Sequence, residues 1–420
     1  MSTTNWTRIK IKYKEMAVVG FYCFDLWHLI LMQLLPNLYA KTIATIGLWL
    51  VLLLAVSKYK SIVKGDAIFL LTVNFVMFIF SYFIHPEYGY AMFQMPTWNI
   101  YASVFTFSSG IFAYLFFRIE TDPSELRTYL KPAAWLCFFW GLLRVRSALS
   151  RGGFTRIFEN GSVSSGSYDM TVGYRFLFVC IVFLVLAMQE KHKGKKIFDC
   201  IMVVVSAILM MVFGSRTAVA SLIFFWCMYS LLYQYEGKNV RDLTKRIGFI
   251  LGLIVGYKVV TNQSILQFIA KIISGLGLGS RMLDTLIQGG VELDLGRNRL
   301  YEMVYEMIRE NPIMGAGIYA DRALGGIYCH QIILEFLLNF GVILGGVFLL
   351  IIAYYCMVML FRCKNSDWKL LFMIFFSMCF IRLNVSSSYW CDTNFWVCVA
   401  IVVNYSKELR RGRVGLKNGS

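Results

Sequence analysis

The sequence predicts an all-α polytopic membrane protein, and three observations lead to that fold class. Hydrophobic residues make up 58% of the 420 residues and charged residues only 15%, whereas soluble domains are about 25% charged. The mean hydropathy is +0.62. The apolar residues also form continuous runs, each able to cross about 30 Å of hydrocarbon as a helix of about 20 residues. Because these runs do not alternate with polar residues, they predict helices rather than a barrel.

We expect about twelve transmembrane helices in a single integral membrane domain that covers residues 1–420. No cleavable signal peptide is predicted, because the basic and polar segment Met1–Glu15 leads directly into a full-length span. Two long connections, 144–174 and 263–330, are predicted to be external loops. The predicted spans are 16–36, 41–57, 66–84, 97–117, 129–145, 171–189, 196–214, 217–235, 246–262, 331–361 with a short leading helix, 367–385 and 388–405.

The Lys and Arg residues set the predicted orientation. Most of the 41 lie on short segments that would all be cytoplasmic if the N-terminus is cytoplasmic. Such clusters are ordinary orientation signals, so both termini are predicted to be cytoplasmic. For the same reason the net charge of +17 does not indicate a nucleic acid partner. The 11 cysteines are scattered without CxxC spacing, and we expect no zinc site, no disulfide framework and no cofactor.

The outer face is predicted to be basic only where its loops are long. The short external link 85–96 carries no Lys or Arg, whereas the loop 144–174 contains Arg144, Arg146 and Arg151. Orientation does not require basic residues in long external loops. Clustered arginines at the bilayer surface therefore indicate an anionic ligand, because guanidinium groups bind carboxylates and phosphates in a fork.

The second long loop is predicted to contain surface structure of its own. Ser264–Leu278 is typical of an interfacial or re-entrant helix. The glycine-rich run 275–281 is interpreted as a hinge rather than a nucleotide loop, because it follows no strand. After Gly296 the spacing of apolar residues predicts an amphipathic helix that lies on the membrane surface. Asn311 and Pro312 are expected to end this helix.

Three arginines are candidates for binding an anion. Arg216 lies in a very short outer turn between two spans, where an arginine is costly and usually functional. The alternative is that its side chain extends to the lipid headgroups. Arg297 follows a glycine at the start of the predicted amphipathic helix, where free N–H groups already favour an anion. Arg175 lies a few residues inside an apolar span, and an ion pair between helices is the alternative there.

His330 is the candidate catalytic base. It is the only histidine in the second long loop, and it lies where that loop re-enters the membrane. A histidine with an ordinary pKa of about 6.5 suits a general base, although a lone histidine is more often structural. Glu335, about one helical turn further, is expected to orient His330 or to be the base itself. Together with Arg175 and Glu335, Arg299 and Arg322 are predicted to contact the substrate.

The combination of arginines and one base on the outer face predicts the chemistry of the ligand. A diphosphate fits several guanidinium groups that are not accompanied by a metal-ligand cluster. A lipid-linked diphosphate sugar is a membrane substrate that needs arginine at headgroup level and a base for an acceptor hydroxyl. The arginines would stabilise the negative charge that develops on the leaving diphosphate.

Three local patterns resemble the O-antigen polymerase and O-antigen ligase superfamily of bacterial membrane proteins. They are G-S-R-T at 214–217, G-R-N-R-L-Y and N-P-I-M-G-A-G at 296–301 and 311–317, and H-Q … E … F-G-V within 330–342. The corresponding family patterns are G-S-R-[GT], G-R-x-x-x-W … N-P-x-x-G-x-G and H-N-x-x-L-[EQ] … G-[IV]. In this chain Tyr301 replaces the tryptophan and Gln331 replaces the asparagine. The resemblance covers residues 200–360, approximately.

The resemblance implies a metal-independent, inverting-type glycosyl transfer from an undecaprenyl-diphosphate-linked oligosaccharide. The reaction would take place on the outer face of the bacterial cytoplasmic (inner) membrane. By this resemblance Arg216 and Arg297 contact the diphosphate, and His330 serves as the base or orients the acceptor. A polymerase of this Wzy type would make O-antigen, capsule or exopolysaccharide, with membrane lipids, a chain-length regulator and a flippase as its expected partners.

Polymerase, ligase and transporter remain as alternatives. A polymerase is favoured by the basic, Ser/Gly-rich first loop and by the departures at Tyr301 and Gln331, which fit the looser patterns of polymerases. A ligase would instead transfer the finished glycan to another acceptor. A transporter of lipid-linked sugars would require charged residues along a path through the bilayer, whereas the charged residues here are confined to one predicted face.

Overall fold

A computed structural model of the chain describes residues 3–24, 26–27, 30, 34–35, 37–89, 92, 110–150, 154–157, 163–166, 169–214, 216–233, 264, 267–268, 270–271, 287, 297–325 and 328–417. These residues group into two compact units. Unit 1 combines the two ends of the chain, Met1–Leu130 and Gly296–Ser420, and unit 2 is formed by Lys131–Leu295. The hydropathy pattern does not predict this division.

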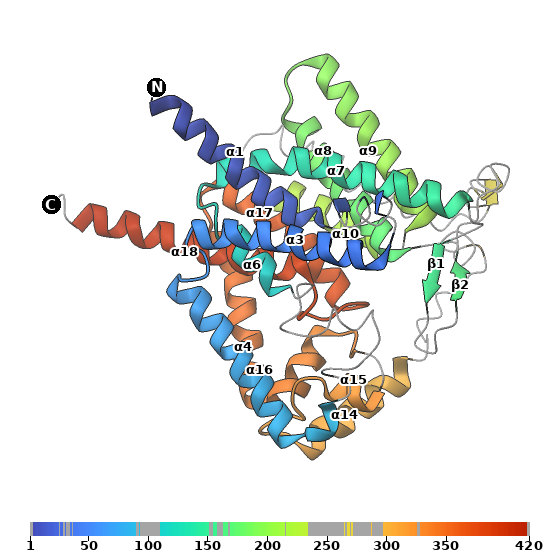
Figure 1. Cartoon of the computed structure of the whole chain (residues 1–420), viewed down its shortest axis with the longest axis vertical. Coiled ribbons are helices and arrows are strands. Elements are labelled where there is room, and N and C mark those ends of the chain that lie inside the picture. The colour runs from blue at the N-terminus through green and yellow to red at the C-terminus, as the bar shows by residue number, and fades with distance from the viewer. Residues whose placement is uncertain are drawn as a thin grey trace. The chain divides into compact units, whose positions relative to one another are not determined.

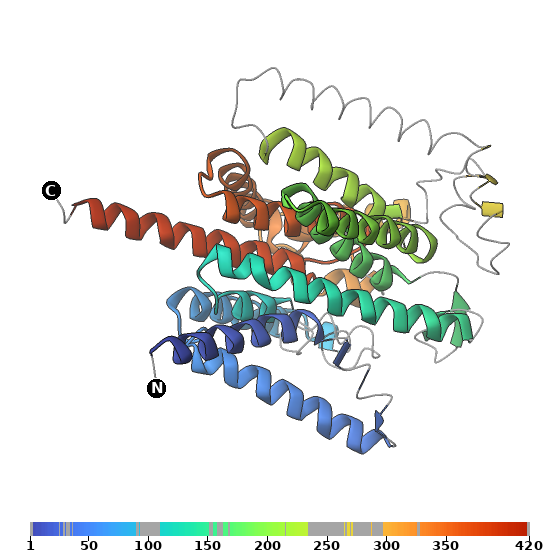
Figure 2. The ribbon, with the colours of Figure 1, turned by 90° about the horizontal axis from the view of Figure 1, so that it is seen from above.

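Unit 1 is helical in all of its described elements, and α18 packs against α6 and α17. In both views the N-terminal end of α1 and the C-terminal end of α18 lie on the same side of the unit (Figures 1 and 2). The elements are α1 (Thr3–Tyr22), α3 (Leu38–Lys58), α4 (Gly65–Ile84), η1 (Pro86–Tyr88), α6 (Ile111–Phe117), α14 (Arg297–Glu310), α15 (Ala320–Gly325), α16 (Ile332–Met357), η4 (Val358–Arg362), α17 (Ser366–Leu383) and α18 (Thr393–Lys417).

Unit 2 is centred on α8, which packs against α9 and α10. The long helix α7 (Pro123–Ser150) begins in unit 1 and continues into unit 2. The other described elements of unit 2 are β1 (Phe154–Ile157), β2 (Val163–Gly166), α8 (Met170–Gln189), α9 (Lys193–Phe213), α10 (Arg216–Met228) and the π-helical turn η3 (Tyr229–Tyr233).

The described residues contain five helical segments that are long and apolar enough to cross a membrane. They are Gly65–Ile84, Met170–Gln189, Lys193–Phe213, Arg216–Tyr233 and Ile332–Arg362. The prediction of a helical membrane protein is therefore confirmed, and the total of about twelve spans stays a prediction. The predicted span 246–262 and most of the predicted span 97–117 lie outside the described residues.

The described elements fit the all-α prediction except for one short hairpin. The first predicted external loop, 144–174, contains an antiparallel hairpin in which Phe154 lies opposite Gly166 and Ile157 opposite Val163. In addition, α7 continues to Ser150, so the loop begins later than predicted. Strands of four residues are too short to produce a recognisable alternation of apolar and polar residues.

The predicted amphipathic helix is α14, but the membrane surface does not cover its apolar face. Val304 and Met307 are buried on that face, whereas Glu302 and Glu306 are exposed on the other. The apolar face packs on the protein itself, because α14 contacts α16 and α15. A hydrophobic stripe shows that a helix face is covered, but it does not show what covers it.

The helix α16 is kinked at Gly341, which has φ 73° and ψ 174°. In a regular helix the amide of Val342 would donate to the carbonyl of Leu338. Here Val342 N donates to Pro312 O at 2.7 Å, and Leu338 O accepts from Ala316 N at 2.7 Å. The loop after α14 therefore satisfies the backbone groups that the kink exposes, as a membrane helix requires. The kink also confirms the predicted short leading helix.

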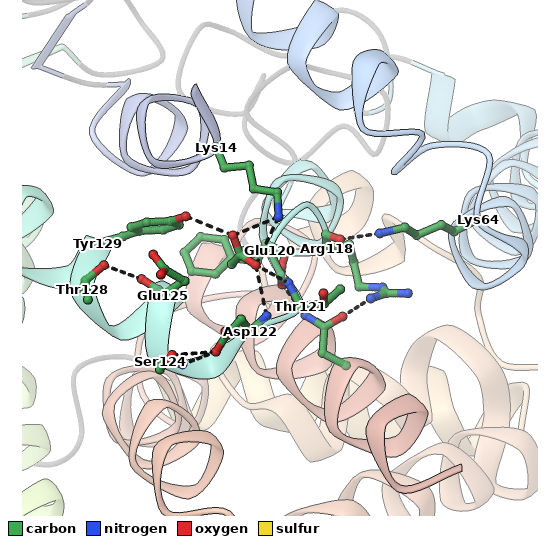
Figure 3. A network of polar contacts seen from close by, with 12 residues as sticks. Lys14, Lys64, Arg118, Glu120, Thr121, Asp122, Ser124, Glu125, Thr128 and Tyr129 are labelled. Carbon is green, nitrogen blue, oxygen red and sulfur yellow. Dashed lines mark hydrogen bonds and ion pairs between the residues drawn. The ribbon is translucent and has the colours of Figure 1, made fainter. Parts of the chain in front are cut away.

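A network of charged side chains ties several elements of unit 1 together, and Figure 3 shows the part of it around Lys14, Lys64, Arg118 and Glu120. We define the Arg118 network as Lys14, Lys64, Asp66, Arg118, Glu120 and Lys407. Arg118 Nε donates to Asp66 Oδ2 at 2.8 Å, and Lys407 also pairs with Asp66. Lys14 Nζ lies 3.2 Å from Glu120 Oε2, and Lys64 Nζ donates to the carbonyl of Arg118 at 2.5 Å. Four of the basic segments that were predicted to be cytoplasmic therefore meet at one place.

The opposite end of α4 meets the loop that follows α14. Ser81 Oγ donates to the carbonyl of Ile318 at 2.9 Å, and Tyr88 donates to the carbonyl of Ala316 at 3.2 Å. Asp66 lies in the first turn of the same helix. A helix of this length spans about 30 Å, so the Arg118 network and the loop 311–320 lie at opposite ends of a segment as long as the bilayer core is thick.

Candidate functional site

His330 adopts an unusual backbone conformation at the entrance to α16. Its φ is 61°, and Tyr319, immediately before α15, has φ 75°. A positive φ is uncommon for residues other than glycine and costs about 1–2 kcal/mol. Such conformations persist only where the surrounding structure fixes them, and they cluster at functional sites. The contacts around His330 therefore make it a candidate site.

Asp321 fixes the chain immediately before His330. The Asp321 side chain is fully buried, and its Oδ2 accepts from the amide of Cys329 at 2.8 Å. Its Oδ1 accepts from the amide of Arg322 at 2.9 Å and from Arg322 Nη1 at 3.0 Å. One carboxylate thus joins α15 to the stretch that leads into α16. These charge-assisted bonds are stronger than bonds between neutral groups.

Arg322 lies buried between two tyrosine rings. Its guanidinium carbon is 5.3 Å from the ring centre of Tyr319 and 5.8 Å from that of Tyr328. Arg322 Nη2 lies 3.6 Å from Glu335 Oε1. Burial alone would lower the pKa of Arg322, but the charges of Asp321 and Glu335 outweigh it, so the pKa of Arg322 is raised. The Arg322 guanidinium therefore remains charged. Because its side chain is only 1% exposed, it is not presented to the surface.

Glu335 receives bonds from the link between α17 and α18. Its Oε1 accepts from the hydroxyl of Ser388, and its Oε2 accepts from the amide of Tyr389 at 3.3 Å. Tyr389 also stacks on Phe336, with ring centres 4.4 Å apart. Glu335 is fully buried. The first turn of α16 is therefore held both by Arg322 and by the 384–392 link.

Tyr328 connects His330 to the 384–392 link that follows α17. The rings of Tyr328 and His330 are 4.3 Å apart, and the Tyr328 hydroxyl donates to the carbonyl of Ser386 at 2.9 Å. Burial raises the pKa of Tyr328, so its hydroxyl stays protonated as a donor. Nearby, Arg382 Nη1 lies 3.5 Å from Oδ2 of the buried Asp392.

We define the His330 cluster as His330, Asp321, Arg322, Tyr328, Glu335 and Ser388. Three of the residues predicted from the sequence, His330, Arg322 and Glu335, are brought together in it. Arg322 and Glu335 are buried and paired with each other, and His330 is half-buried. Arg299 is exposed on α14, and the side chain of Arg297 lies outside the described part of the structure.

The other two predicted arginines belong to unit 2, at one end of α8. A Cβ on Gly214 would lie 2.8 Å from Gly173 Cα, so the turn after α9 needs glycine to approach α8 this closely. The exposed residue Arg216 begins α10 just after this turn, and Arg175 lies two residues after Gly173. The half-buried Arg175 has Nη1 3.8 Å from Cys137 Sγ on α7.

Part of the His330 cluster was not anticipated from the sequence. Ser388 and Tyr389 lie in the run S-S-S-Y-W-C-D at 386–392, at the start of the predicted span 388–405. The available signal was a run of serines followed by an acid, Asp392, at the start of a predicted span. Asp392 Oδ1 accepts from Phe395 N at 3.0 Å and caps α18. Asp392 is thus explained by its role as the cap of α18. Ser388 supplies the hydroxyl that donates to Glu335.

Among the residues that the structure describes, no three His, Cys, Asp or Glu side chains are grouped as metal ligands. Comparisons of the chain with protein-family models, with curated proteins and with solved structures find no match. The chemistry of the site therefore has to be argued from its own residues.

Proposed function

We propose that this membrane protein is a polysaccharide polymerase that joins undecaprenyl-diphosphate-linked oligosaccharide repeat units. The observation that carries the proposal is the strained, half-buried His330, held at the entrance to α16 by the fully buried Asp321, Arg322 and Glu335. Strain that is supported by buried charge is typical of a residue whose position matters for chemistry. The sequence resemblance gives that residue the role of a base.

In the proposed reaction, His330 accepts the proton of an acceptor sugar hydroxyl. The hydroxyl oxygen then forms a bond to the anomeric carbon of the donor sugar, and the bond from that carbon to the diphosphate oxygen breaks with inversion. The lipid diphosphate leaves with the electron pair of that bond. Arginines stabilise its charge, and the resemblance assigns this task to Arg216 and Arg297.

Arg322 and Glu335 receive a different role from the one expected of them. Because both are buried and paired, we assign them to positioning His330 rather than to direct contact with the substrate. Arg299 is exposed on α14 and Arg175 is half-buried in α8, and a contact of either with the substrate stays a prediction.

The placement of the charged groups supports an active face on the outside. The Arg118 network gathers basic segments that orientation rules place in the cytoplasm, and its Asp66 lies in the first turn of α4. The loop that leads to the His330 cluster contacts the last turn of the same helix. A bilayer-thick helix between them fits a site on the outer face of a bacterial cytoplasmic membrane.

The test uses purified full-length protein with one synthetic undecaprenyl-diphosphate-linked repeat unit. A ladder of products is expected from the wild type. His330→Ala should slow its formation by about 10²- to 10⁴-fold, the usual contribution of a general base. The control is Glu306→Gln, which changes an exposed residue of α14 and should leave turnover unchanged.

The outcomes separate the possible activities. No product without an added second acceptor would indicate a ligase or a transporter instead of a polymerase. A ladder formed at the wild-type rate by His330→Ala would remove His330 as the base. Normal polymer lengths from both Arg216→Ala and Arg297→Ala would contradict the diphosphate assignment.

A further inference from the structure

The turn between α3 and α4 carries positive charge without a matching carboxylate. In the Arg118 network Asp66 is already paired with Arg118 and Lys407, and Glu120 with Lys14. Over the described residues, no carboxylate forms an ion pair with Lys58, Lys60 or Lys64. The network thus joins four cations to two carboxylates, and the two exposed lysines of the turn add to the excess.

Part of this excess charge is withdrawn from water, which makes it costly. Arg118 is 1% exposed, and Lys64 is only partly exposed. Burial, and then the positive charge of Arg118, lower the pKa of Lys64 to about 8. Buried charge is tolerated when a counter-charge lies beside it. An anion at the turn would supply that counter-charge.

Two tyrosines stand beside the lysines, as is common at the boundary between membrane and water. Lys58 Nζ lies 4.3 Å from the ring centre of Tyr13, and Lys14 Nζ lies 5.8 Å from that of Tyr59. The rings of Tyr13 and Tyr59 are 5.8 Å apart. These pairs join the end of α3 to α1 at headgroup level and hold the lysines in place.

Apolar surface begins directly beside the turn. From it α3 and α4 run in diverging directions (Figure 1). Leu50 and Leu54 are exposed on α3, and Phe69 and Val76 are exposed on α4. Only 22% of the candidate span in α4 is buried inside the protein. A ligand that carries both an anionic head and hydrocarbon chains matches this combination of surfaces.

We propose that the α3–α4 turn, with Lys58, Lys60 and Lys64, binds the phosphate of an anionic glycerophospholipid whose acyl chains cover the exposed faces of α3 and α4. This site lies at the end of α4 opposite the loop that leads to His330. The inference goes beyond the proposed polymerase activity and does not depend on it. The lipid is identified by its chemistry, a phosphate ester with net negative charge joined to two hydrocarbon chains.

The test measures lipid retention by native mass spectrometry on full-length protein in neutral detergent. Dioleoyl phosphatidylglycerol should be retained in preference to dioleoyl phosphatidylcholine. Each lysine near an anionic headgroup contributes about 1 kcal/mol, equivalent to about fivefold in affinity. Lys60→Gln should therefore weaken phosphatidylglycerol binding about fivefold, and replacing Lys58, Lys60 and Lys64 together should weaken it on the order of a hundredfold.

A matched control and a second ligand make the result decisive. Lys191→Gln changes an exposed lysine of unit 2 and should bind phosphatidylglycerol like the wild type. Glycerophosphoglycerol, the same headgroup without acyl chains, should bind far more weakly than the lipid. Equal retention of both lipids by the wild type, or an unchanged affinity in Lys60→Gln, would overturn the proposal. Binding of the free headgroup as tight as that of the lipid would show a phosphate ester site instead.

Discussion

At the scale of single residues, the backbone of His330 is held by side chains rather than by regular structure. Asp321 receives the amide of Cys329, and Arg322 links Asp321 to Glu335. The cost of a positive φ at His330 is offset by these buried contacts. The positive charge of Arg322 is the centre of the arrangement, because two buried carboxylates depend on it.

Replacing Arg322 should therefore destabilise the folded protein strongly. Arg322→Leu leaves Asp321 and Glu335 buried without a cation, and breaking a buried pair in this way costs about 3–5 kcal/mol. Glu335→Gln keeps oxygen and nitrogen atoms in place near Ser388 and should cost less. Unfolding of the purified protein in detergent measures both changes.

The matched control is Arg309→Leu on the exposed face of α14. This substitution should change the free energy of unfolding by no more than about 0.5 kcal/mol, as is usual at the surface. If Arg322→Leu were as mild as Arg309→Leu, the buried cluster would not be what stabilises the His330 loop.

Two residues of the His330 cluster were singled out for this site from the sequence by their pattern. A lone histidine before an apolar run, with an acid about one turn later, singled out His330 and Glu335. Their support could not be predicted, because Ser388 lies more than fifty residues away in the chain, and its contact with Glu335 depends on tertiary packing. The same limit explains why Arg322 was expected to contact substrate. Sequence shows that an arginine is present but not whether it is buried.

At the scale of elements, two motifs that are separated in sequence prove to be one structural feature. The run N-P-I-M-G-A-G at 311–317 docks on the kink of α16. Gly315 and Gly341 both have positive φ, and a Cβ on Gly315 would lie 2.5 Å from Gly341 N. The glycines are needed both for their backbone conformation and for the closeness of the two segments.

Gly341→Ala should consequently destabilise the protein. A Cβ at this position would lie 2.1 Å from the carbonyl oxygen of Ile313. The left-handed backbone adds about 1–2 kcal/mol, and the clash adds about 1–3 kcal/mol of overpacking. A lower midpoint of thermal unfolding in detergent would report this loss of stability.

Gly346→Ala is the control within the same helix, because a Cβ there would meet nothing within 4 Å. Alanine in a helix interior is favoured over glycine by about 1 kcal/mol, so this variant should be neutral or more stable. Similar stability of the two variants would show that the kink does not depend on the glycine.

The helices were predicted better than the contacts between them. The predicted spans 66–84, 171–189 and 196–214 match α4, α8 and α9 closely, because length and hydropathy determine a membrane helix almost alone. The amphipathic pattern of α14 was also recognised. Its partner was not, since an apolar stripe packs equally well on lipid or on another helix.

At the scale of the whole molecule, the distribution of basic residues makes a prediction about orientation. The Arg118 network unites basic segments that are distant in sequence, and α4 runs from this network to the loop before α15. Orientation rules place such segments in the cytoplasm. Glu306 on α14 should then be external, and Lys195 at the start of α9 cytoplasmic.

Labelling with a membrane-impermeant maleimide tests this orientation. In a cysteine-free variant of the chain, Glu306→Cys should react in intact cells and Lys195→Cys should react only after the cells are opened. Both residues are exposed, so access within the protein is matched. Reaction of Lys195→Cys in intact cells would reverse the proposed orientation and place the His330 cluster on the cytoplasmic face.

The hydrogen bond between Val342 and Pro312 has a further consequence for how the chain can vary. It closes a loop of the chain that begins at Pro312, contains α15 and His330, and ends at Val342. Both ends of the loop are anchored at one point on a membrane helix. Lengthening a closed loop costs free energy only slowly. Insertions in this loop can therefore reshape the surface around His330 while α16 keeps its path across the membrane, which gives the protein a way to change what that surface binds without refolding.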